Sequence, residues 1–366
     1  MIRLSFFPMS SPIRVLVVGC GHMGASHALA YHQSPFFQIC GLVSRTEESR
    51  SRLNEQLGGC YALFSDYATA LAEAKPDAVC ISTYPDTHAA YAEAALRAGC
   101  HVFLEKPLAT TLADAERLIA LARERGLKLA VGYILQQHPA WTRFVEEARK
   151  LGKPLVMRMN LNQQSSGAEW QTHKAIMASM SPIVDCGVHY VEVMCRMTQS
   201  RPVRVHAIGA RLTEELPAGH VNYGQLQVTF EDGSVGWYEA GWGPMMSQTA
   251  FFVKDVIGPL GCASIAAASS TLKDSADVNS HTKTDSILVH RAALDPNGRF
   301  AEKDQVLSMT DEPDHDGLCA REQAFFADAI LENRDLTAHW DSAIGSLRIV
   351  LAADESMRSG KVVELP

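Results

Sequence analysis

The sequence predicts an α/β protein built from two different parts. From Ile13 to Tyr133, short apolar runs alternate with helix-like segments, as in a doubly wound parallel sheet. After about residue 135, strand-like runs joined by hairpin turns predominate, which favours a largely antiparallel, open sheet with helices on one face. We therefore expect one domain over residues 1–135, beginning with a loose tail at 1–11, and a second α/β domain over 136–366.

The composition excludes several classes of protein. The chain has 366 residues and a formal net charge of -8, so it carries no basic footprint for nucleic acid. No apolar run approaches the roughly 20 residues that span a bilayer. The nine cysteines include no C-x-x-C pair, and the start of the chain does not read as a signal peptide. We expect reduced thiols, a cytoplasmic location, and neither a nucleic acid nor a membrane partner; no metal is predicted.

A glycine-rich motif follows the first predicted strand, Ile13 to Val18. It reads Gly19-Cys20-Gly21-His22-Met23-Gly24, a G-x-G-x-x-G, and a helix-like segment follows from Ala25. Glycines there allow a tight turn and close approach to a pyrophosphate, while the helix amino terminus offers free N–H groups. The motif alone is weak, but its position between a strand and a helix makes it a strong prediction of dinucleotide binding.

The end of the second predicted strand, Phe37 to Val43, bears on the choice of cofactor. NAD-binding folds usually carry an acid about 20 residues after the glycines, where it binds a ribose hydroxyl. Here Ser44, Arg45 and Thr46 stand at that place, and they can donate hydrogen bonds to a 2′-phosphate. The sequence thus favours NADP over NAD. Alternatively, Arg45 is a solvated surface cation.

A Glu105-Lys106-Pro107 triplet ends the strand-like run Cys100 to Leu104. Ligands of open α/β sheets bind at the carboxyl ends of the strands, so Lys106 is placed to meet a substrate beside a nicotinamide. Proline blocks continuation of the strand. The other interpretation is an ordinary charged loop.

The second part contains a helix, Pro139 to Lys150, and then a strand, Leu155 to Asn162. A polar, irregular stretch follows over Gln163 to Met180. Further strands are predicted at Val203–Arg211, Gly224–Phe230, Ser234–Ala240 and Thr249–Val256, a loop at Ser264–Lys283, and helices at Ala320–Glu332 and Asp341–Ser359.

Ser181 and Pro182 start a helix that carries Asp185 and His189 four residues apart, on one face. Gly187 between them costs about 1 kcal/mol in a helix interior, which indicates close approach by a neighbour or ligand. A dipole-stabilised aspartate and a satisfied histidine would give the same pattern.

These motifs together resemble the Gfo/Idh/MocA family of oxidoreductases. The resemblance rests on the glycine motif, Thr83 to His88, Glu105-Lys106-Pro107, Val131-Gly132-Tyr133 and Asp185 to His189. It implies a Rossmann domain followed by an open-sheet domain, and NAD(P)-dependent hydride transfer to or from a sugar, cyclic polyol or related carbohydrate. It also implies a homo-oligomer, a dimer or tetramer.

The resemblance, with the motifs above, implies these site residues. Catalytic candidates are Lys106, Asp185 and His189. Cofactor candidates are Gly19, Gly21, His22, Met23, Gly24, Ser44, Arg45, Thr46, Thr83, Pro85, His88, Glu105 and Lys106. Substrate candidates are Tyr133, Gln136, Trp170 and His173.

Three positions depart from the family pattern. Met180 and Ser181 replace two glycines, and Glu192 replaces an aspartate, which bears on the substrate rather than the fold.

The expected chemistry assigns one role to each catalytic candidate. His189 would be the base, since its ordinary pKa is about 6.5. Asp185 would orient it or hold a substrate hydroxyl, and Lys106 would stabilise the alkoxide. Two alternatives stay open: a glycoside-processing enzyme that uses NAD in a transient oxidation, and a non-catalytic nucleotide-binding regulator.

Overall fold

A computed structural model of the chain describes residues 11–247, 253–266 and 284–366. The predicted tail lies almost wholly outside this range, as do the start of the predicted strand Thr249–Val256 and most of the predicted loop Ser264–Lys283. Within the described residues, no helix has both the length and the apolar character needed to cross a membrane.

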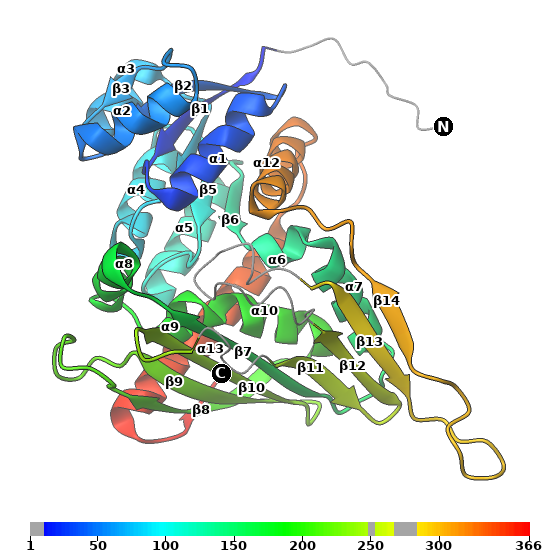
Figure 1. Ribbon diagram of the computed structural model, residues 1–366. Helices are drawn as coiled ribbons and strands as arrows, with labels where there is room; N and C mark the ends of the chain where they lie inside the picture. Colours follow the sequence, from blue (N-terminus) through cyan, green and yellow to red (C-terminus); the bar gives the residue numbers. More distant parts are fainter. Residues whose placement is uncertain (1–10, 248–252, 267–283) are drawn as a thin grey trace, which may run out of the picture.

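The first part of the chain forms a six-stranded parallel sheet, as predicted (Figure 1). Its strands are β1 (Ile13–Val18), β2 (Phe37–Val43), β3 (Leu63–Phe64), β4 (Ala78–Ile81), β5 (His101–Glu105) and β6 (Leu129–Gly132). Their spatial order, β3-β2-β1-β4-β5-β6, reverses direction at β1, which makes the β1/β4 boundary the switch point of a Rossmann fold. The strands read as apolar runs because helices cover both faces.

The connecting helices are α1 (His22–Gln33), α2 (Glu47–Gln56), α3 (Tyr67–Ala74), α4 (Pro85–Arg97) and α5 (Leu112–Glu124). Their beginnings follow from local chemistry. Asp66 caps α3 by accepting from the Thr69 amide, and Thr111 caps α5 by accepting from the Asp114 amide.

The second part forms a nine-stranded mixed sheet in the order β14-β13-β12-β11-β7-β10-β9-β8-β15. The strands are β7 (Val156–Gln164), β8 (Pro202–Ala210), β9 (Tyr223–Phe230), β10 (Val235–Gly243), β11 (Lys254–Gly258), β12 (Gly261–Ala266), β13 (Ser286–Arg291), β14 (Gln305–Ser308) and β15 (Val363–Glu364). All neighbours pair antiparallel except β7 and β10, which run parallel. The predicted hairpin turn at 231–233 does join β9 to β10.

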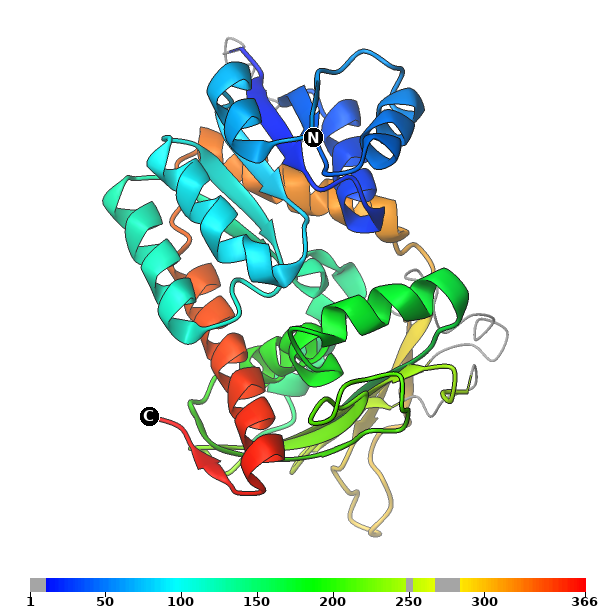
Figure 2. The ribbon, with the colours of Figure 1, turned by 90° about the vertical axis from the view of Figure 1, so that its left-hand side faces the viewer.

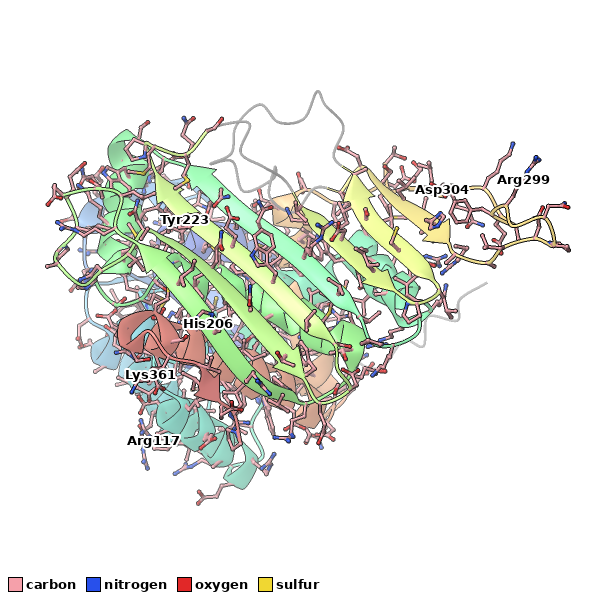
Figure 3. All side chains as sticks on the ribbon, turned by 90° about the horizontal axis from the view of Figure 1, so that it is seen from below. Arg117, His206, Tyr223, Arg299, Asp304 and Lys361 are labelled. Carbon is pink, nitrogen blue, oxygen red and sulfur yellow. The ribbon has the colours of Figure 1, made fainter. Side chains whose placement is uncertain are left out.

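Helices cover one face of this sheet and leave the other bare (Figures 1 and 3). They are α6 (Ile134–Gln137), α7 (Pro139–Arg149), α8 (Gly167–Met177), α9 (Pro182–Asp185), α10 (Gly187–Thr198) and α13 (Thr337–Ser359). A further helix, α12 (His315–Leu331), lies alongside α1 in both ribbon views (Figures 1 and 2). There Phe326 packs against Phe37 and Phe103 of the parallel sheet.

Several local predictions were wrong. The stretch predicted to be irregular holds helix α8, which buries only Trp170 and Met177 and so shows little apolar periodicity. Residues 264–266, predicted as loop, belong to β12. The helix predicted to run on from Pro182 is interrupted at Cys186, which separates α9 from α10.

Candidate active site

The glycine motif forms the turn between β1 and α1. Gly19 has a φ of +100°, and a Cβ there would lie 2.3 Å from the carbonyl oxygen of Ser82. A Cβ on Gly24 would lie 1.8 Å from the oxygen of Gly19, whereas one on Gly21 would meet nothing within 4 Å. The turn is therefore closed on the protein side and open at Gly21, as a pyrophosphate requires.

The next two motif residues begin α1. His22 is exposed and Met23 is half-buried.

The residues after β2 form an open, polar corner. Ser44 is half-buried, while Arg45 and Thr46 are exposed. A residue that the sequence reading missed joins them: Arg50, one turn into α2, donates from Nη1 to the backbone oxygen of Ser44 at 3.1 Å. Its charge also opposes the rise that burial causes in the pKa of Cys20, so Arg50 lies near the glycine turn as well. Two arginines thus flank this corner.

The segment after β4 is braced by a buried histidine. His88 Nδ1 lies 2.8 Å from the oxygen of Pro107, and its Nε2 lies 3.0 Å from the oxygen of Thr83. Burial lowers the pKa of His88. Pro85 is the first residue of α4, and the Thr83 hydroxyl contacts that of Thr87 at 2.6 Å. His88 therefore ties this turn to the Glu105-Lys106-Pro107 turn and does not present its ring to a ligand.

Lys106 and Asp185 form an ion pair across the two parts of the fold. Lys106 Nζ donates to Asp185 Oδ1 at 2.9 Å and to the Asp185 backbone oxygen at 3.2 Å. Burial would lower the pKa of Lys106, but the charges of Asp185 and Glu105 and the hydrogen bond to Asp185 together outweigh it and raise that pKa, so the ammonium stays charged. The site holds a fixed cation at the carboxyl end of β5.

Glu105 anchors the same turn from within. Its Oε1 lies 2.7 Å from His27 Nε2, and its Oε2 accepts from the Lys106 amide at 3.1 Å. Burial would raise its pKa, but the His27 hydrogen bond and the charges of His27 and Lys106 bring the pKa of Glu105 to about 2. Glu105 thus stays ionised and holds the backbone on which Lys106 is mounted.

His189 lies on the first turn of α10, beside this ion pair. Its ring is half-buried; Nδ1 is enclosed and has no hydrogen-bond partner among the described residues, which leaves Nε2 as the nitrogen at the accessible surface. Burial and the Lys106 charge lower the pKa of His189 to about 4, so the ring is neutral at pH 7. Asp185 is engaged by Lys106, and within the described structure no hydrogen bond joins it to His189.

Gly187 explains how α10 packs so closely under the site. A Cβ at this position would lie 2.9 Å from Cε1 of Tyr238, a fully buried ring on β10. The close approach expected from the sequence is therefore made by the sheet.

Two substrate candidates are turned into the protein. Tyr133 is 2% exposed, and its hydroxyl contacts Ser346 Oγ at 2.8 Å. Gln136 donates to Glu192 Oε1 at 2.9 Å, and its own oxygen lies 3.2 Å from His339 Nδ1. Tyr133 and Gln136 support the site in this structure, with the Tyr133 ring 5.9 Å from the His189 ring.

The other two candidates lie on α8. The buried Trp170 donates from Nε1 to Glu215 Oε1 at 3.1 Å. His173 stacks on Trp242 with ring centroids 4.4 Å apart. Trp242 Nε1 in turn donates to Gln163 Oε1 at 2.7 Å, and Cys186 Sγ lies 3.5 Å from the same oxygen. Through Trp242 and Gln163, His173 is thereby connected to Cys186, the residue next to Asp185. Trp170 instead bonds to Glu215.

Gln163 and Trp242 escaped the sequence reading because they end β7 and β10, which are far apart in the chain and adjacent only through parallel pairing. A separate cavity of about 990 Å³ lies behind α9, around Ser181, Asp354 and Arg348; its lining includes none of Lys106, Asp185 and His189.

Comparison with known proteins decides the family. A family model described as "Oxidoreductase family, NAD-binding Rossmann fold" (GFO_IDH_MocA) matches residues 13–133, and the GFO/IDH/MocA C-terminal domain model matches residues 143–253. The chain belongs to the Gfo/Idh/MocA family.

Named relatives of this Gfo/Idh/MocA protein include dehydrogenases. It is 32% identical over 197 residues to UDP-N-acetylglucosamine 3-dehydrogenase of Acidithiobacillus ferrooxidans, covering 54% of this chain and 58% of the relative. It is 28% identical over 197 residues to inositol 2-dehydrogenase 1 of Saccharopolyspora erythraea, covering 53% and 56%. The matches thus span little more than half of these relatives.

Solved structures share the whole fold. An oxidoreductase domain protein from Kribbella flavida superposes with a TM-score of 0.80, covering 98% of this chain and 100% of that one, at 21% identity. The two-part architecture is that of the Gfo/Idh/MocA fold throughout.

Proposed function

We propose that this chain is an NADP-dependent dehydrogenase or reductase that transfers hydride between nicotinamide and a hydroxyl or carbonyl carbon of a sugar or cyclic polyol. One observation carries the proposal: the Lys106 ammonium is fixed by Asp185 beside His189, at the sheet edge where the glycine turn opens. The similarity to a sugar-nucleotide dehydrogenase and an inositol dehydrogenase supports the substrate class.

The residues present fit a bound dinucleotide. Gly21 has no side chain, and the space that its Cβ would occupy is open. Gly19, Gly21 and Gly24 would hold the pyrophosphate with the α1 amino terminus. When bound, the nicotinamide supplies hydride chemistry. Glu105 and Thr83 would help to position the cofactor through the backbone turns that they brace.

The protein's own part in the reaction is proton and charge handling. In the oxidation direction, the substrate hydroxyl would give its proton to His189 Nε2, which is neutral at pH 7. The Lys106 ammonium would stabilise the oxygen as it becomes an alkoxide, and in reduction it would polarise the carbonyl. Asp185 keeps Lys106 charged and in place. His173, carried on Trp242, is the α8 residue best placed to contact the rest of the substrate.

The preference for NADP rests on the corner after β2. Arg45 and Arg50 flank Ser44, and position 44 itself carries no acid to repel a 2′-phosphate. A guanidinium pair binds a phosphate through charge-assisted hydrogen bonds.

The same proposal includes the organisation of the protein. We place the domain boundary at residues 135/136, within the short helix α6 (Ile134–Gln137), since the last parallel strand, β6, ends just before it at Gly132. The bare face of the nine-stranded sheet supports a homo-oligomer. All nine cysteines are free, which supports a reducing, cytoplasmic location.

The test is a titration of purified protein with NADPH and with NADH, followed by tryptophan quenching. NADPH should bind at least about tenfold more tightly, and Arg45→Ala should reduce that preference by about tenfold, the effect of losing one charge-assisted contact. Arg52→Ala, which removes an exposed arginine on α2, is the matched control and should leave the preference unchanged.

Equal binding of both cofactors would overturn the NADP preference alone. Binding of neither would overturn the proposed enzyme. With the preferred cofactor known, sugars and cyclic polyols are then screened for turnover.

A further inference from the structure

We propose a buried zinc site between α1 and α12, with His27, Cys319, Glu322 and His315 as ligands. It uses none of the predicted catalytic residues, although His27 contacts Glu105, and it does not depend on the proposed function. No part of the sequence reading pointed to it.

The ligand atoms are already gathered. One ligand atom from each of His27, Cys319 and Glu322 lies within 4.8 Å of the other two, and all three residues are buried. Both ring nitrogens of His315 lie 3.9 Å from Cys319 Sγ. In a tetrahedral zinc site, Zn–S and Zn–N bonds of about 2.3 and 2.0 Å put such atoms roughly 3.5 Å apart. His27, Cys319 and Glu322 form the close group, and His315 would turn toward them from beside Cys319 to complete the set.

The spacing on α12 produces this arrangement. His315, Cys319 and Glu322 are separated by four and three residues, so all three project from one face of the helix. That face packs against α1, which supplies His27 (Figures 1 and 2).

The burial of Glu322 without a hydrogen-bond partner is the observation that indicates a ligand. Its side chain is 3% exposed, and neither carboxylate oxygen has a hydrogen-bond partner among the described residues. A buried carboxylate without a partner is costly, and Glu105 nearby adds like charge. A divalent cation would bind the Glu322 carboxylate and the Cys319 thiolate together.

His27 is oriented to serve as a ligand. Its Nε2 faces Glu105 Oε1 at 2.7 Å, so Nδ1 points toward α12, where Gln323 Nε2 lies 2.9 Å away. Metal-bound histidines usually donate their second N–H to a carboxylate in this way. The metal would replace the Gln323 amide at Nδ1; the oxygen of that amide has no partner among the described residues.

The donor set selects the metal. A thiolate and two imidazoles favour zinc over magnesium or calcium, which prefer oxygen ligands. On binding, the Cys319 thiol and the Glu322 carboxyl each release a proton, and their two negative charges balance the cation. The bound ion would clamp α12 to α1 and hold His27 on Glu105, which in turn carries the Lys106 backbone.

The test uses the full chain with cobalt as a spectroscopic probe for zinc. Elemental analysis of protein purified without chelators should find about one zinc per chain. After zinc removal, cobalt should bind with the same stoichiometry and give a thiolate-to-cobalt charge-transfer band. Cys319→Ser should abolish the band. Cys262→Ser, a half-buried cysteine far away on β12, is the matched control and should keep it.

Glu322→Gln is a second test of the site. It should still fold, because it removes the charge of the side chain and preserves its shape. It should weaken cobalt binding by at least about tenfold, and zinc should no longer raise the melting temperature as it does in the wild type. Absence of metal from the wild type together with no cobalt binding would overturn the proposal. So would a charge-transfer band that survives Cys319→Ser, or zinc stabilisation that survives Glu322→Gln; a protonated Glu322 bound to a buried water would then account for the site.

Discussion

Lys106 and Asp185 are the residues on which the candidate chemistry depends, because each holds the other's charge in a buried place. Lys106→Met keeps the length of the side chain and removes the ammonium. We expect turnover to fall by about 10²–10⁴-fold, since a preorganised charge at the reacting oxygen is lost. Cofactor affinity should change by less than about threefold, because Glu105 and the glycine turn are untouched.

The matched control for this variant is Lys361→Met, which removes an exposed lysine near the carboxyl terminus (Figure 3). Steady-state kinetics and NADPH titration measure both quantities. Wild-type turnover in Lys106→Met would remove Lys106 from the mechanism.

His339 offers a pH-dependent test at the same scale. Its Nε2 accepts from the Val131 amide at 2.9 Å, which requires an unprotonated nitrogen, and burial lowers its pKa to about 4. Between about pH 6.5 and 4 the unfolded chain binds a proton at this histidine and the folded chain does not. The free energy of unfolding should therefore fall as pH drops through that window, by on the order of 1–3 kcal/mol from this residue.

Urea unfolding at several pH values measures the effect. His339→Gln should flatten the acid slope, whereas His206→Gln, at an exposed position on β8, should leave it unchanged (Figure 3). An unchanged slope in His339→Gln would show that His339 is already protonated in the folded chain or does not accept the Val131 hydrogen bond.

At the level of elements, what the sequence could predict was local. The glycine turn, the proline after Lys106 and the Ser181-Pro182 helix start are each fixed by neighbours in the chain, and all three were predicted. The role of Arg50 could have been read from its place one turn into α2, had that helix been recognised.

Other features depend on contacts that no local pattern encodes. The interruption at Cys186 separates α9 from α10 just where Gly187 meets Tyr238 from a distant strand. Asp185 was expected to orient His189 or to hold a substrate hydroxyl; in the structure it pairs with Lys106, which is 79 residues away in the chain. Only the docking of the two sheets brings these groups together.

Gly187→Ala tests the packing of α10 on the sheet. The new methyl group would lie 2.9 Å from a fully buried tyrosine ring, and such overpacking should cost about 1–3 kcal/mol of stability. Gly345→Ala on α13 is the matched control, since its methyl group meets nothing within 4 Å. That control should gain up to about 1 kcal/mol from helix propensity.

Chemical denaturation of both variants compares the two effects directly. Equal stability changes in Gly187→Ala and Gly345→Ala would mean that α10 can move away from β10 at little cost.

At the scale of the whole molecule, the end of the chain joins the two parts. On α13, Trp340 Nε1 donates to the oxygen of Leu129 at 2.8 Å, and His339 accepts from Val131, so both hold β6. The α12 helix packs against α1, one of the helices that cover the parallel sheet. The sequence assigned these helices to the second domain, since nothing local to them shows that they pack on the first.

The bare face of the large sheet leads to the last prediction. Ile208 on β8 is 56% exposed there, and it lies in register with Gln225 on β9 and Glu239 on β10. An antiparallel sheet can face water, but a wide face with apolar side chains among its polar ones is also suited to a second copy. We expect a homo-oligomer through this face, and light scattering after size exclusion measures its mass.

Ile208→Lys should shift the protein toward monomer, because the symmetric interface would bury two new charges. Leu331→Lys, at a similarly exposed position at the end of α12, is the matched control and should leave the mass unchanged. If the wild type is a monomer at micromolar concentration, the bare face is simply solvated. If Leu331→Lys dissociates the oligomer and Ile208→Lys does not, copies meet through α12 instead, and the metal clamp proposed there would then lie beside the interface.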